Sequence, residues 1–165
     1  MKLLDRKLKH NLWRYLFQSF LATLAILSIL LFLDILKQTA IIASLGATAF
    51  IVFTAPKSYS SEVRSLIGGY LVGISSGILC HYLALLYYNH FADLKILYIA
   101  FGSLAVGLSI FLMVITDTEH PPASGIALGL VINKWSYLTI IFVISGVLIL
   151  YFAKKLLRSF LVDLR

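Results

Sequence analysis

The sequence predicts an all-α integral membrane protein with six helical segments. Of its 165 residues, 61% are hydrophobic and only 13% are charged, whereas a soluble domain carries about 25% charged residues. A chain of this length cannot hide so much apolar surface in a core of its own, so lipid must cover the remainder. Charged residues divide the chain into long uncharged runs, and the basic residues gather at its two ends.

The uncharged runs define the expected elements in order: 15–33, 38–56, 65–92, 96–116, 120–133 and 135–153. A helix needs about 20 apolar residues to cross a bilayer, and the first, third, fourth and sixth runs supply them. The second run contains Ser44-Leu45-Gly46, and the fifth is short and opens near Pro121-Pro122. We therefore expect four spans and two short, interrupted helices, which either cross the membrane or dip in and return.

Basic segments at 1–14 and 154–165 flank a single transmembrane domain, residues 15–153. Such clusters are typical of cytoplasmic anchors beside anionic headgroups. With either topology both termini lie in the cytoplasm, and we expect a bacterial inner membrane. The net charge of +7 does not indicate nucleic-acid binding, because no basic face with interleaved aromatic residues exists outside the apolar runs.

A weak internal repeat relates residues 15–92 to residues 96–153. A shift of 80 residues overlays 17–36 on 97–116 and Ala43-Ser44 on Ala123-Ser124. With three elements per half, the second half starts on the opposite side of the membrane, which makes an inverted-topology repeat. In such folds, short interrupted segments in matching positions point to the binding site.

Small residues at a spacing of four line one face of the third segment: Ser65, Gly69, Gly73 and Gly77. Such a stripe lets another backbone approach closely. It indicates either helix packing within the chain or the seam of a homodimer. Because a chain this small buries little interior alone, we expect a homo-oligomer, with a dimer favoured, in either case.

The most unusual stretch runs from Thr116 to Gly125. Proline has no backbone N–H and fits the first turn of a helix, so Pro121-Pro122 should begin the fifth helix. The free N–H groups of residues 123–125 would then make an anion site at the positive end of that helix. Gly125 leaves room for an anion, and Ser124 adds a hydroxyl donor.

Three small residues of the second segment, Ser44, Gly46 and Thr48, are candidates for the opposite wall of this site. If that segment is broken, its exposed backbone would face the same cavity. The alternative for the fifth segment is that His120-Pro121-Pro122 is a tight surface loop that ends the fourth helix and has no other role.

These residues carry a family resemblance. His120-Pro121-Pro122-Ala123 after a long apolar helix resembles the signature of the HPP family of integral membrane proteins. The run 42–49, followed by Ala55-Pro56 and the run 66–69, is similar to the first conserved block of that family. The two blocks stand in the family order, and the resemblance covers residues 10–153.

The resemblance implies a membrane protein with at least four spans. Some plant and cyanobacterial members are described as nitrite transporters, and for most bacterial members the substrate is not established. Ser124 departs from the glycine that usually follows His-Pro-Pro-Ala. Asp117 and Glu119 make the preceding loop acidic, which would repel an anion. Such a loop would suit a cation, or proton coupling through Asp117 or His120.

We therefore expect a permease for a small ion, most simply an inorganic anion such as nitrite. Its binding residues would be His120, Pro121, Pro122, Ser124, Gly125, Ser44, Gly46 and Thr48. The alternative is a non-transporting membrane module that binds a protein or lipid partner through the small-residue stripe.

We expect no enzyme activity and no cofactor, since the sequence shows no nucleophile-and-base spacing and no glycine-rich phosphate loop. We also expect no metal site, because Asp117, Glu119 and His120 crowd into four residues before two prolines and fit poorly around one ion.

Overall fold

The computed structural model describes residues 8–32, 39–88 and 94–164, and within these ranges the chain is helical without strands. The elements are α1 (Leu8–Phe32), α2 (Thr39–Thr54), the short 3-10 helix η1 (Tyr59–Ser61), α3 (Val63–Tyr87), α4 (Leu94–Ile115), α5 (Pro122–Ile132) and α6 (Tyr137–Leu156). The predicted all-α fold with six helical segments is confirmed. Of the predicted basic segment 1–14, residues 1–7 lie outside the described ranges.

Three described helices, α3, α4 and α6, are long and apolar enough to cross a membrane. Large apolar side chains on them, such as those of Leu86 and Phe111, are exposed, which suits a surface that lipid covers. The other apolar helices found among the described residues are shorter: Leu12–Leu27, Thr39–Thr54 and Pro122–Ile132. The predicted span 15–33 extends beyond the described residues, so its full length stays a prediction.

The second segment differs from expectation, because α2 is one continuous helix and the interruption predicted near Ser44-Leu45-Gly46 is absent. The Ser44 hydroxyl donates to the carbonyl of Ala40 at 2.8 Å, four residues earlier. A hydroxyl that bonds back to the preceding turn satisfies itself inside a helix. The small polar residues of α2 therefore do not interrupt the helix.

The stripe of small residues on α3 faces α5 and the connection before it, within the same chain. A Cβ added at Gly69, Gly73 or Gly77 would lie 2.6 Å from His120 Cβ, 2.3 Å from the Ala123 carbonyl oxygen or 2.9 Å from the Ala127 carbonyl oxygen, respectively. No side chain fits there, so the stripe serves helix packing inside the chain. Because these residues are buried, the stripe is not free to form a homodimer seam.

The same contacts show the path of α5. Its eleven residues extend only about 16 Å, at about 1.5 Å per residue, roughly half the thickness of a bilayer core. It follows α3 in the same direction, and beyond it the Trp135 ring packs edge-on at 5.3 Å against His81, near the end of α3. The fifth segment therefore advances along the bundle, which favours a crossing over a return.

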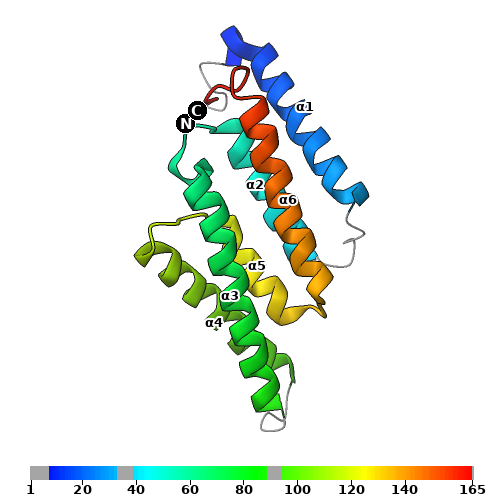
Figure 1. Ribbon diagram of the computed structural model, residues 1–165, viewed down its shortest axis with the longest axis vertical. Coiled ribbons are helices and arrows are strands. Elements are labelled where there is room, and N and C mark those ends of the chain that lie inside the picture. The colour runs from blue at the N-terminus through cyan, green and yellow to red at the C-terminus, as the bar shows by residue number, and fades with distance from the viewer. Residues whose placement is uncertain (1–7, 33–38, 89–93, 165) are drawn as a thin grey trace.

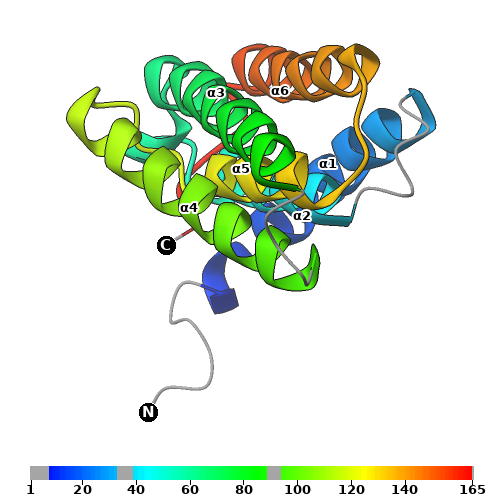
Figure 2. The same ribbon diagram turned by 90° about the horizontal axis from the view of Figure 1, so that it is seen from below.

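Successive helices alternate in direction, and α5 lies in the middle of the bundle (Figures 1 and 2). It contacts α2, α3 and α4, whereas α1 packs on α2 and α6. If α1 is exchanged with α4, α2 with α5 and α3 with α6, each pair of contacting helices becomes another contacting pair. The three-element repeat stays a prediction that this pattern supports.

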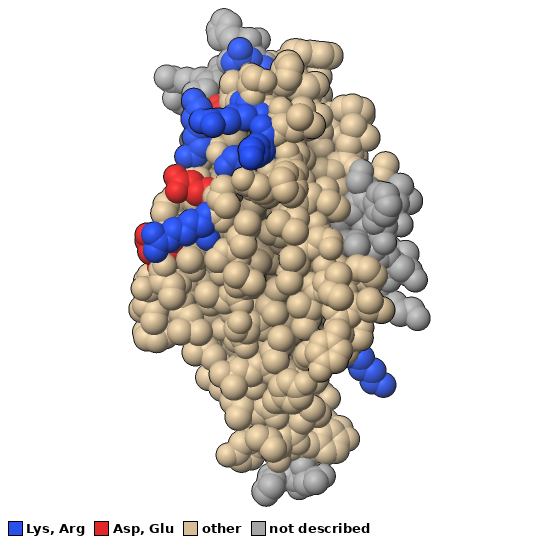
Figure 3. Space-filling model, viewed as in Figure 1, with Lys and Arg blue, Asp and Glu red and all other residues tan. Residues whose placement is uncertain are grey.

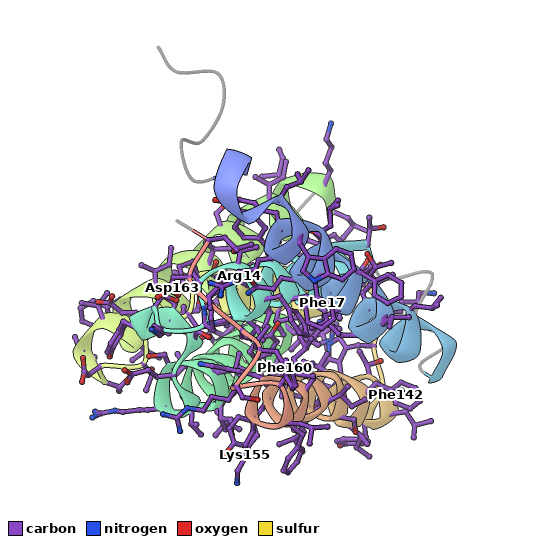
Figure 4. The ribbon with its side chains drawn as sticks, turned by 90° about the horizontal axis from the view of Figure 1, so that it is seen from above. Arg14, Phe17, Phe142, Lys155, Phe160 and Asp163 are labelled. Atoms are coloured by element: carbon purple, nitrogen blue, oxygen red, sulfur yellow. The ribbon has the colours of Figure 1, made fainter. Side chains whose placement is uncertain are left out.

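The segment after α6 folds back over the end of the bundle. The fully buried Gln18 donates from its Nε2 atom to the Val162 carbonyl at 2.9 Å, and Phe17 packs edge-on against Phe160 (Figure 4). The predicted basic segment 154–165 thus begins inside α6, which ends at Leu156. A lysine can continue a helix because its long side chain carries the ammonium group to the end of the bundle.

Candidate functional site

The two sequence blocks meet at His120, whose side chain is fully buried. Its Nε2 atom lies 2.9 Å from Thr48 Oγ1 in α2, and its Nδ1 atom lies 2.7 Å from the carbonyl oxygen of Ser60 in η1. A carbonyl only accepts, so Nδ1 carries the proton and the neutral Nε2 accepts from the Thr48 hydroxyl. His120 thus joins three segments that lie far apart in the sequence.

Tyr70 of α3 extends this network. Its hydroxyl lies 2.7 Å from Thr48 Oγ1, and its ring centroid lies 5.4 Å from that of His120. Thr48 Oγ1 also lies 3.0 Å from the carbonyl oxygen of Ser44. The single hydroxyl hydrogen of Thr48 can therefore point to His120 Nε2 or to the Ser44 carbonyl. When it points to Ser44, Thr48 Oγ1 can accept a hydrogen bond from a protonated His120. The network has a hydrogen-bonded arrangement for both charge states of the histidine.

Burial sets which of these states is present. It lowers the pKa of His120 from 6.5 to about 4, and the hydrogen bond to the Ser60 carbonyl offsets part of that effect. Taking the charged imidazolium out of water is unfavourable. His120 is therefore neutral at pH 7.

The backbone N–H groups in the first turn of α5 are not all free to bind an anion. The N–H of Ala123 bonds to the His120 carbonyl at 2.9 Å, and the N–H of Ser124 bonds to the Pro121 carbonyl at 3.1 Å. The Ser124 hydroxyl also donates to Pro121, at 2.8 Å. As expected, Pro122 takes the first helical position. In this conformation, two of the N–H groups expected to hold an anion are bonded within their own turn.

Gly125 faces α2, because a Cβ added there would lie 2.3 Å from Ser44 Oγ. The glycine lets α2 and α5 cross closely. Gly46 differs from the other predicted residues, since a Cβ added to it would meet open space. The structure thus brings Ser44, Thr48 and Gly125 together with His120, and leaves Gly46 outside.

Asp117 lies apart from the buried network and is exposed. Its carboxylate is 3.4 Å from the Arg64 guanidinium and accepts from the Tyr59 hydroxyl at 2.7 Å. That hydrogen bond is the main reason why the pKa of Tyr59 is raised. Asp117 has a φ of 57°, a left-handed conformation that aspartate tolerates. Glu119 is exposed as well.

Sequence reasoning missed Tyr70 and Ser60. A hydroxyl-bearing aromatic residue within an apolar helix was the available signal for Tyr70, because a buried tyrosine hydroxyl needs a partner. Ser60 contributes only its backbone carbonyl, for which side-chain identity gives no signal.

Comparison with known proteins gives the family of the chain. Residues 7–160 match the family model described as HPP, transmembrane region. One transmembrane protein of Dictyostelium discoideum is 33% identical over 129 residues, which cover 75% of this chain and 43% of that protein. A second from the same organism is 29% identical over 154 residues, or 90% of this chain and 47% of that protein.

The chain spans about half the length of these curated relatives. No solved structure matches it. The histidine and two prolines that shape the buried junction stand within the matched region, and since that region takes in nearly the whole sequence, the chain belongs to the HPP family of transmembrane proteins.

Proposed function

We propose that this chain is a membrane permease for a small inorganic anion such as nitrite, and that His120, Thr48 and Tyr70 form its gate. The observation that carries the proposal is a fully buried, titratable hydrogen-bond network where α2, α3 and α5 meet. Polar groups inside a membrane protein are costly and point to function. The resemblance to a family with nitrite-transporting members supports the choice of an anion.

The conformation described here is the closed state of the proposed permease. Ser44 and Gly125 hold α2 and α5 in close contact, and the first-turn donors of α5 are bonded internally. Opening would separate His120 from Thr48 and free the Ser124 hydroxyl for the anion. A protonated His120 would offer both a second N–H donor and a positive charge, so we expect flux to rise as the pH falls.

The test is anion flux into liposomes that contain the purified protein, for nitrite, nitrate and chloride between about pH 4 and pH 7. Thr48→Val keeps the shape of the side chain and removes the hydroxyl that bonds His120. Thr54→Val is the matched control on the same helix, because the Thr54 hydroxyl donates to the Phe50 carbonyl of its own turn at 2.7 Å.

We expect saturable flux from the unmodified protein and from Thr54→Val. We expect a higher flux with a weaker pH dependence from Thr48→Val, because its closed state lacks the hydrogen bond to His120 that opening breaks. Circular dichroism and size-exclusion profiles show whether each variant is folded. Equal flux from two folded threonine variants at every pH would contradict the role of the network.

A second candidate is a non-transporting module that binds a partner. The close packing of α5 against α3 and α2 favours it, because a rigid junction serves a scaffold as well as a gate. This candidate predicts that the folded protein carries none of the three anions at any pH.

A further inference from the structure

A cavity of about 690 Å³ lies at the end of the bundle where α6 ends and α3 begins. Its walls come from the connection after α2, the first turn of α3, and the last turns of α6 with the segment that follows. Figure 3 shows that Lys and Arg side chains gather toward this end of the molecule. The cavity is separate from the His120 network.

The lining of this cavity is strongly basic. Among the residues that the structure describes, five Lys and Arg residues line it, against one acidic residue, Glu62. The five are Lys57, Arg64, Lys154, Lys155 and Arg158. Like charges held around one space repel each other, so an anion in the cavity would relieve this repulsion.

Only part of this charge is used within the protein. Lys154 donates to the Ser61 hydroxyl at 2.7 Å, and Arg64 donates to the Thr116 carbonyl at 3.0 Å. The side chains of Lys57, after α2, and Arg158, after α6, have no hydrogen-bond or ion-pair partner within the described ranges. Their donors are free to bind a ligand.

Two further features define the chemistry of that ligand. The first turn of α3, a 25-residue helix, begins at the cavity without a side-chain cap from Glu62. Its positive end adds to the field there, and the Glu62 carboxylate offsets part of that field. Val63, Tyr151 and Leu161 supply apolar lining. The cavity thus offers several cationic donors beside a hydrophobic wall.

We propose that this cavity binds a phosphate group, carried by an anionic phospholipid or by a small soluble phosphate ester. Guanidinium groups match phosphate oxygens in a fork geometry, and the volume is in the range of small-molecule sites. The cavity lies at the ends of two helices that can span the membrane, where the phosphates of lipid headgroups also lie. This inference does not rest on the proposed permease activity.

The test measures binding to the purified full chain in nanodiscs of neutral phosphatidylcholine. Titration with phosphatidic acid, or with soluble glycerol 3-phosphate, is followed by native mass spectrometry. The variant is Lys57→Gln with Arg158→Gln, which removes two cations and no side-chain hydrogen bond or ion pair within the described ranges. Its control is Lys95→Gln with Lys134→Gln, which removes the same charge outside the cavity.

We expect phosphatidic acid to bind roughly 10- to 30-fold more weakly to the cavity variant than to the control, at about a fewfold loss per cation. If glycerol 3-phosphate competes with the lipid, the site takes soluble phosphate as well. If it does not compete, the site takes its phosphate from lipid. Equal binding of phosphatidic acid to the two double variants, or no preference for phosphatidic acid over phosphatidylcholine, would overturn the proposal.

Discussion

Lys154 and His120 hold successive residues of the same short helix. The Lys154 ammonium donates to the carbonyl and the hydroxyl of Ser61, and His120 Nδ1 donates to the carbonyl of Ser60 at 2.7 Å. One contact comes from the basic cavity and the other from the buried network. Hydrogen bonds from two different segments therefore hold the 3-10 helix η1 in place.

Removal of the Lys154 contact should destabilise the fold measurably. In Lys154→Met the Ser61 carbonyl and hydroxyl both lose a charged donor, and hydrogen bonds to charged groups contribute about 1.5–3 kcal/mol. We expect the free energy of unfolding in detergent micelles to fall by that amount. Lys155→Met, one position along the helix and exposed, should change it by less than about 0.5 kcal/mol. A similar loss in both variants would contradict the inference that Lys154 stabilises η1.

His120 should make stability depend on pH. Its pKa is lowered to about 4 in the folded state from 6.5, so between these values the unfolded chain binds more protons. The stability that the neutral imidazole contributes is complete above about pH 6.5 and is lost as the pH falls toward 4. The full difference is about 3 kcal/mol.

The measurement is the free energy of unfolding at pH 7 and at about pH 4.5, for the unmodified protein and for His120→Asn. We expect the variant to be less stable at pH 7, because a buried hydrogen bond is lost, and to show a flatter pH dependence over this interval. An unchanged slope in the folded variant would assign the pH dependence to other groups.

The sequence predicts best those features that depend on local chemistry. The start of α5 at Pro122 follows from the missing N–H of proline, and the close approach to Gly73 follows from small residues at helical spacing. The continuity of α2 could not be predicted in the same way. Ser44 bonds back to the preceding turn, and a serine that does so looks the same in a sequence as one at which a helix breaks.

The partners of His120 were beyond sequence reasoning for a different reason. The contact with Thr48 and the nearness of Tyr70 depend on how α2, α3 and α5 cross, which no single segment specifies. The basic cavity has the same origin, because Lys57 and Arg158 face one space only after α6 returns to the start of α3.

The conformation of Asp117 gives a backbone prediction. Its φ of 57° is accessible to glycine without cost, whereas a β-branched residue is strained there. The ion pair with Arg64 is exposed on both sides and contributes little. We expect Asp117→Gly to stay within about 1 kcal/mol of the unmodified protein, and Asp117→Val to lose about 1–3 kcal/mol. Thermal unfolding in detergent checks both, and an equal loss in the two variants would assign the effect to the carboxylate rather than to the backbone.

Two glycines on neighbouring helices should respond oppositely to the same substitution. At Gly73 the new Cβ of alanine would lie 2.3 Å from the Ala123 carbonyl oxygen, a backbone atom that cannot move without shifting α5. We expect Gly73→Ala to cost about 2 kcal/mol or more, as overpacking does. At Gly107 on α4 the new Cβ meets open space, and alanine is favoured over glycine in a helix by about 1 kcal/mol.

Gly107→Ala should therefore unfold at a higher temperature than the unmodified protein, and Gly73→Ala at a lower one. The pair separates packing from helix propensity, because each variant adds the same methyl group to a helical glycine. If α3 and α5 were loosely packed in the folded protein, both alanine variants would be stabilising. That outcome would also remove the argument that the close contact of α5 with its neighbours closes the proposed gate.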